Sequence, residues 1–144
     1  MQEHEAREIA REVMRPAGLL LHLVGRGHWW PGEASLRGGK LEIGRVVAAT
    51  YLWLNPVWSQ YSQLDPGGER TDPLDLADGP AEAEDSPDDL FTALLQLRAA
   101  AKAVLPALLL GFPSDRERLV EGAEALDVAA EGATRFILGE KARL

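Results

Sequence analysis

The segment from Leu90 to Leu110 constrains the fold more than any other part of the chain. Apolar residues recur along it at helical spacing, at Leu90, Leu94, Leu97, Ala101, Val104 and Leu108. Its polar residues are few: Thr92, Gln96, Arg98 and Lys102. A helix that is apolar on nearly every side must be covered on nearly every side. We therefore expect the other helices of the chain, or a second copy of it, to surround this helix.

The same segment is not expected to cross a membrane. A bilayer span needs about 20 residues with few or no charges, whereas this one carries Arg98, Lys102 and Pro106. The N-terminal sequence MQEHEAREIAREV alternates charges and has no apolar core, unlike a signal peptide. The chain has no Cys, which fits a reducing compartment. These features predict a cytoplasmic protein that does not contact a membrane.

Local signals around this segment predict an antiparallel helical hairpin. Ser86-Pro87 provides an N-cap residue followed by Pro at the first helical position. Gly111 and Pro113 end the first helix. Ser114, with Glu117 three residues later, resembles a capping box that starts a second helix. Two long helices with so short a connection must pack antiparallel.

The N-terminal part is less clearly patterned. A helix is expected over residues 3–14, with an interruption at Pro16-Ala17-Gly18. Gly38-Gly39-Lys40 is interpreted as a turn. Residues 41–54 fit both a helical face and a strand, and the helix is preferred. Asn55-Pro56 is expected to cap a short helix that reaches Leu64.

These elements predict a mainly α fold, a bundle of four to five helices with the C-terminal hairpin as its spine. The alternative is an α+β fold with a small N-terminal meander, which requires residues 41–54 to form a strand. The 144 residues suit a single domain.

The net charge of −8 is concentrated in one segment. Residues 64–89 hold ten acidic residues and one base, and the other residues hold 13 acids and 14 bases. Residues 64–88 are therefore interpreted as an acidic flexible linker, held to the body only at Leu74 and Leu76. Its acids are candidate partners for a basic stripe on the first helix, formed by Arg7, Arg11 and Arg15. No clustered basic surface is evident, so no nucleic-acid partner is expected.

No residue pattern points to catalysis. Without Cys the chain cannot form thiolate metal sites or use a Cys nucleophile. His4 and Glu8 are four residues apart, but two groups are too few to hold a metal. No catalytic residues, metal or cofactor are predicted, and an enzyme is the less favoured interpretation.

Aromatic residues are concentrated in the N-terminal half, where six of the nine lie between residues 29 and 61. Such a cluster is either a local core or a binding surface, because Trp and Tyr are enriched among binding hot spots. The candidate partner- or ligand-binding residues are Trp29, Trp30, Trp53, Trp58, Tyr61 and His28.

Three functions remain open from the sequence. The favoured one is a non-enzymatic interaction or assembly module that forms a homo-oligomer, with a further protein partner left open. The second is a small helical enzyme or ligand-binding protein with an aromatic pocket. The third is a regulator that uses the acidic linker to engage a basic protein surface.

Overall fold

The protein is a helical bundle. The computed structural model describes residues 1–25, 29–67, 73–76 and 86–144. Of these residues 83% are helical and none is in a strand. The mainly α prediction is confirmed, and the α+β alternative is wrong. The helices in chain order are α1 (Glu3–Val24), α2 (Glu33–Trp53), α3 (Asn55–Gln60), the 3₁₀ turn η1 (Ser62–Leu64), α4 (Pro87–Gly111), the 3₁₀ turn η2 (Pro113–Asp115) and α5 (Arg116–Lys141).

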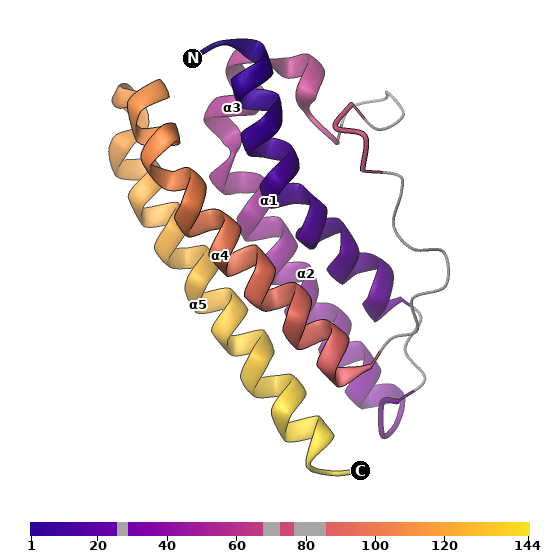
Figure 1. Cartoon of the computed structure of the whole chain (residues 1–144). Coiled ribbons are helices and arrows are strands. Elements are labelled where there is room, and N and C mark those ends of the chain that lie inside the picture. Colours follow the sequence, from indigo (N-terminus) through magenta and orange to yellow (C-terminus); the bar gives the residue numbers. More distant parts are fainter. Residues whose placement is uncertain (26–28, 68–72, 77–85) are drawn as a thin grey trace.

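The four long helices form a ring in which each packs against two neighbours. α1 lies against α2 and α4, and α5 lies against the same two helices (Figure 1). α2 begins where α5 ends, since Ser35 donates a hydrogen bond to Glu140. α4 also begins at this end, where Asp88 pairs with Lys141. α2 and α4 therefore run in the same direction. The end of α3 and the start of α4 lie at opposite ends of the bundle.

α1 is longer than expected. The predicted interruption at residues 16–18 is wrong, because one helix continues through Pro16 to Val24. Proline in a helix interior removes a main-chain hydrogen bond and costs about 3 kcal/mol. Here Pro16 and Ala17 are buried, and the apolar face continues through Leu20 and Leu23. Burial of that second half against the bundle offsets the local cost.

α2 also begins earlier than expected. The predicted turn at residues 38–40 is wrong, since these residues lie inside the helix. Both glycines are contact points: a Cβ at Gly38 would collide with the ring of Phe136, and one at Gly39 with the ring of Trp30. The Gly pair therefore permits close packing rather than a chain reversal. Residues 41–53 are helical, as preferred from the sequence.

The helix-end predictions had mixed outcomes. Ser86 caps α4, with its Oγ accepting a hydrogen bond from the Asp89 N–H at 3.1 Å, and Pro87 is the first helical residue. The predicted capping box at Ser114 is wrong, because residues 113–115 form a 3₁₀ turn and α5 starts at Arg116 without a side-chain cap. Asn55 is the first residue of α3 rather than its cap, and that helix ends at Gln60.

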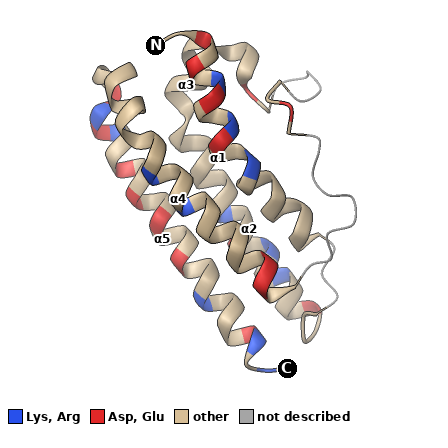
Figure 2. Ribbon diagram, viewed as in Figure 1, with Lys and Arg blue, Asp and Glu red and all other residues tan. Residues whose placement is uncertain are grey.

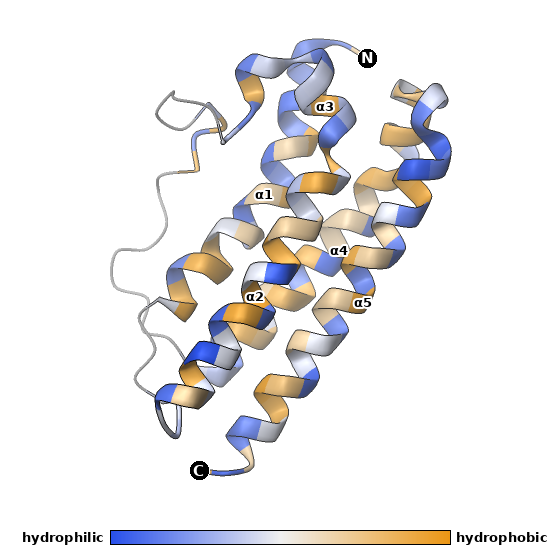
Figure 3. Ribbon diagram, turned by 180° about the vertical axis from the view of Figure 1, so that it is seen from behind, coloured by the Kyte–Doolittle hydropathy of each residue, from blue (hydrophilic) through white to orange (hydrophobic). Residues whose placement is uncertain are grey.

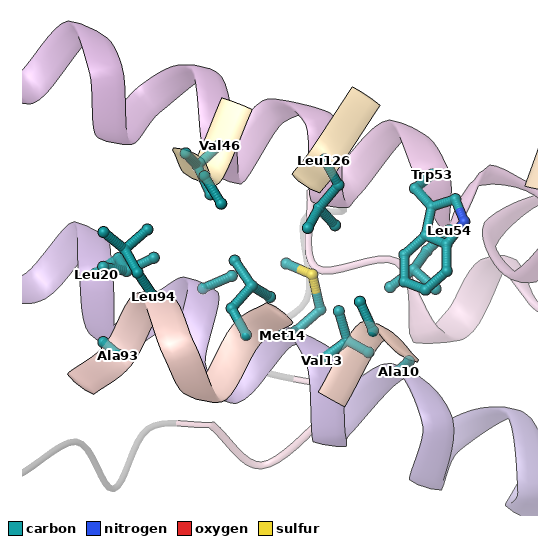
Figure 4. Close-up of a cluster of buried hydrophobic side chains, with 14 of the residues drawn as sticks. Ala10, Val13, Met14, Leu20, Val46, Trp53, Leu54, Ala93, Leu94 and Leu126 are labelled. Carbon is teal, nitrogen blue, oxygen red and sulfur yellow. The ribbon is translucent and has the colours of Figure 1, made fainter. Parts of the chain in front are cut away.

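Apolar side chains from all four long helices meet along the bundle axis. Met14, Val46, Leu94 and Leu126 point toward one another from α1, α2, α4 and α5 (Figure 4). Apolar and polar residues alternate along α2 (Figure 3). Charged residues are more numerous along α1 and α5 than along α2 and α4 (Figure 2). The predicted antiparallel hairpin of α4 and α5 is confirmed by the Arg98–Asp127 ion pair at 2.8 Å and by the packing of the two helices.

The expectation that the other helices of the chain surround α4 is wrong, and cover by a second copy stays a prediction. α1 and α5 pack against it, and its buried residues face them. The opposite side stays exposed, including Leu95 (66%) and Leu110 (85%). In this ring each long helix has only two neighbours, so the other three helices do not cover α4 on all sides.

Candidate functional site

Trp29 and Trp30 lie at the end of the bundle where α2 starts. Their rings stack with centroids 4.0 Å apart, and Trp30 also contacts Phe136 of α5. Trp30 is buried against the main chain of Gly39, whereas Trp29 is half-buried. The indole Nε1 of Trp29 is buried and has no hydrogen-bond partner among the described residues. Trp30 therefore closes this end of the core, and Trp29 is the more accessible of the pair.

Trp53 joins α2 to α5. Its ring is buried, and its Nε1 donates a hydrogen bond of 2.8 Å to the main-chain oxygen of Leu119. Gly122 lies directly against the ring, since a Cβ at that position would be 2.6 Å from Cδ1. A buried indole with a satisfied N–H belongs to the core rather than to a binding surface.

Trp58 and Tyr61 lie at the opposite end from Trp30. Trp58 is buried, stacks on Tyr51 with centroids 5.7 Å apart, and donates a hydrogen bond to the main-chain oxygen of Tyr51. The hydroxyl of Tyr61 donates to the main-chain oxygen of Met1. These contacts fasten the N-terminus and α3 across the end of the bundle.

Tyr51 also ties this end to the start of the long connection. Its hydroxyl donates a 2.6 Å hydrogen bond to the carboxylate of Asp65, which also accepts the N–H of Gly67. This hydrogen bond, with burial and the negative charge of Asp65, raises the pKa of Tyr51 above its ordinary value of 10.0.

The candidate aromatic residues are therefore divided between two ends of the molecule. Trp30 precedes α2 and Trp53 ends it, and a helix of 21 residues is about 30 Å long. The four Trp residues do not line one pocket in the described part of the chain. His28 lies outside the described residues. His22 of α1 is half-buried, and its Nε2 has no hydrogen-bond partner within the part of the chain that the structure describes.

Other polar groups do not assemble into a catalytic or metal-binding arrangement. Within residues 1–25, 29–67, 73–76 and 86–144, no three of the His, Asp and Glu side chains converge as metal ligands would. Half of the acids on the α-helices instead pair with a nearby base, as Glu131 does with Arg135 and Glu42 with Arg45.

The most distinctive surface is the outer side of α4, which the sequence analysis identified only as a helix that needs cover. The α4 face, as it is called below, consists of the exposed apolar residues Leu95, Ala99, Ala103, Pro106, Ala107 and Leu110. Single exposed hydrophobic residues are normal, whereas a contiguous apolar patch marks an interaction site. α4 is also the one helix in the described residues long and apolar enough to span a membrane, a property that core helices of soluble proteins share.

A second distinctive feature lies along α1. The α1 strap, residues 73–76, crosses this helix, and Leu74 is fully buried in the core. Arg7 donates to the main-chain oxygen of Pro73, and Arg11 donates both to that of Leu74 and to the carboxylate of Asp75. The linker is held at Leu74 and Leu76, as predicted, but the prediction that it is held only there is wrong, because Leu64 is buried and Asp65 bonds Tyr51. One of its acids, Asp75, meets the basic stripe at Arg11. The flexibility of the linker elsewhere stays a prediction.

Comparisons with family models, with curated proteins and with solved structures find no match for this chain.

Proposed function

We propose that the protein is a non-enzymatic assembly module that forms a homodimer through the α4 face. The observation that carries the proposal is the exposure of Leu95 and Leu110 on the helix with the most apolar sequence in the chain. If a second helix packed against this face, the side chains of Leu95 and Leu110 would be removed from water, which favours association. A cytoplasmic location is part of the same proposal, because it fits a chain without Cys.

The pattern of the face favours a second copy as the occupant. Leu95 and Leu110 are about 22 Å apart along the helix, with small residues between them. If two α4 helices pair antiparallel, Leu95 of one copy meets Leu110 of the other, and the small residues let the helices approach closely. Two-fold contacts of this kind are self-complementary by symmetry.

Charge does not decide how two copies would pair. The face carries no acid, and Lys102 on its flank would lie near the midpoint of an antiparallel pair. The charges near the two ends of α4 are mixed, because Asp88 pairs with Lys141 at its start, and Asp115 and Glu117 alternate with Arg116 and Arg118 beyond its other end. The antiparallel arrangement therefore rests on the positions of Leu95 and Leu110 and on two-fold symmetry.

The size of the face predicts a weak dimer. Burying one exposed Leu side chain contributes about 1.5–3 kcal/mol. The two leucines of both copies together then contribute about 5–9 kcal/mol, after allowing for the surface that is already covered. Association costs at least about 4 kcal/mol in lost freedom of motion. The difference is at most about 5 kcal/mol, so the leucines alone support a dissociation constant no tighter than about 0.2 mM.

Sedimentation velocity over a range of protein concentrations tests the proposal. The wild-type chain is expected to shift from monomer to dimer, and Leu95→Glu is expected to remain monomeric. Leu52→Glu is the matched control, because Leu52 is exposed to 68% on α2, away from the face. A wild-type chain that shows no dimer at about 1 mM, well above the tightest dissociation constant expected here, would refute the proposal. So would a dimer that Leu52→Glu breaks and Leu95→Glu does not.

The two alternatives receive less support. An aromatic pocket would need the Trp residues to converge, but Trp53 and Trp58 are buried in core contacts of their own. An acidic lure for a basic partner would need free carboxylates, and the described Asp75 is already paired with Arg11.

A further inference from the structure

The contacts between α1 and the α1 strap have the form of peptide recognition within one chain. Arg7 and Arg11 lie one turn apart on α1 and bind two successive main-chain carbonyls, those of Pro73 and Leu74, at 3.0 and 2.9 Å. Hydrogen bonds to main-chain carbonyls do not depend on the side chains of the bound segment. They therefore hold the backbone of the bound segment, a turn at Pro73 and Leu74, without specifying its sequence.

Two further contacts supply selectivity. The side chain of Leu74 is fully enclosed by the core, which requires an apolar residue of about that size. The guanidinium of Arg11 reaches the Asp75 carboxylate at 3.1 Å, so a carboxylate is favoured at the following position. Arg11 is itself held by Glu8 at 3.1 Å, which fixes the orientation of its planar head.

The strap is bound less firmly than the helices are. It is a stretch of four described residues with one fully buried side chain, and Asp75 has a left-handed backbone with φ of 55°. That conformation is unfavourable for residues other than Gly, although Asp and Asn tolerate it best. The Asp75 carboxylate is largely exposed in its ion pair with Arg11, so this pair favours a carboxylate only modestly. Such a segment opens at a lower free energy than the bundle unfolds.

We propose that this part of α1 is a docking site for a short, turn-forming peptide of another protein, and that residues 73–76 are its internal, displaceable occupant. The peptide that fits has a leucine followed by a carboxylate residue. The site is on α1 and does not depend on the proposed dimerisation through α4. Because the strap is tethered, it competes at a high effective concentration, and the external peptide binds only by displacing it.

Thiol labelling of the full chain measures that displacement. The chain has no Cys, so Leu74→Cys introduces a single thiol whose reaction with a maleimide reports how often the strap is open. A capped peptide that contains Pro-Leu-Asp-Leu is expected to raise the labelling rate about tenfold at saturation. The matched peptide Pro-Ser-Asp-Leu, in which Ser replaces the residue that corresponds to Leu74, is expected to leave the labelling rate unchanged. Leu126→Cys, which reports on the buried core far from the strap in sequence, is expected not to respond to either peptide.

Arg11→Gln added to Leu74→Cys tests the residue that makes two of the contacts. The labelling rate without peptide is expected to rise about tenfold, because hydrogen bonds from a charged donor are lost. The effect of the peptide is expected to shrink correspondingly. Circular dichroism confirms that each variant is folded before its rate is compared.

Three results would overturn the proposal. One is a Leu74→Cys rate that the Pro-Leu-Asp-Leu peptide does not change. Another is an equal acceleration of Leu126→Cys, which would show that the peptide unfolds the bundle. The third is a rate that rises with protein concentration alone, which would assign the site to the strap of a second copy instead of another protein.

Discussion

Replacing Gly122 by Ala tests whether the close approach of α5 to Trp53 stabilises the bundle. The new Cβ would lie 2.6 Å from Cδ1 of Trp53 and 3.3 Å from Cγ. These atoms are near the base of the side chain, and the ring is fixed by burial and by its hydrogen bond to Leu119. The ring cannot swing aside, so either α2 or α5 must shift.

Two opposing contributions set the magnitude. Ala is favoured over Gly in a helix interior by about 1 kcal/mol. Overpacking a well-packed core costs about 1–3 kcal/mol. We expect Gly122→Ala to lower the free energy of unfolding by about 1 kcal/mol, or to lower Tm by about 2–4 °C in a domain of this size.

Gly132→Ala is the matched control, because it makes the same change in the middle of the same helix. The nearest atom to its new Cβ is Oε2 of Glu42, at an ordinary contact distance of 3.7 Å. This variant is expected to gain about 1 kcal/mol from helix propensity. Urea unfolding followed by far-UV circular dichroism measures both. Equal stability of the two variants would refute the close packing of Gly122 against Trp53.

Two further predictions concern a helix cap and a phenol. Ser86→Ala is expected to lower the free energy of unfolding by about 1 kcal/mol, whereas Ser114→Ala, at a position that caps nothing, is expected to change it little; urea unfolding of both checks this. The pKa of Tyr51 is raised in the folded chain, so its contribution to stability is complete below pH 10.0 and is lost as pH rises through the folded-state pKa. Spectrophotometric titration of wild type and of Tyr51→Phe isolates the Tyr51 phenol as the difference between the two curves. This phenol is expected to ionise above pH 10.0, and its ionisation at or below pH 10.0 would contradict the hydrogen bond to Asp65.

The sequence predicted those elements that local signals determine. The start of α4 follows from Ser86-Pro87, and its end follows from Gly111 and Pro113. α1 and α2 were misjudged because tertiary packing overrides local propensity in both. Pro16 is accommodated by burial of the helix beyond it. The glycines of α2 are explained only by Trp30 and Phe136, which come from elsewhere in the chain.

The candidate site was predicted in part, for a related reason. Charge alone paired the basic stripe on α1 with the acidic linker, and Arg11 does bind Asp75. The aromatic residues close in sequence were expected to be close in space. Once residues 33–53 form one helix, however, Trp30 and Trp53 lie at its two ends. The α4 face could be inferred only as a need for cover, since the side left open depends on where α1 and α5 pack.

The connection between α3 and α4 divides the chain into two helical hairpins, α1–α2 and α4–α5, and neither hairpin forms a complete hydrophobic core by itself. α1 packs on α4 and α2 packs on α5, so each hairpin buries its apolar face against the other hairpin. A single cut of the backbone between α3 and α4 should therefore leave two fragments that stay bound to each other. Mixing the separately produced fragments would turn folding of this protein into a second-order reaction.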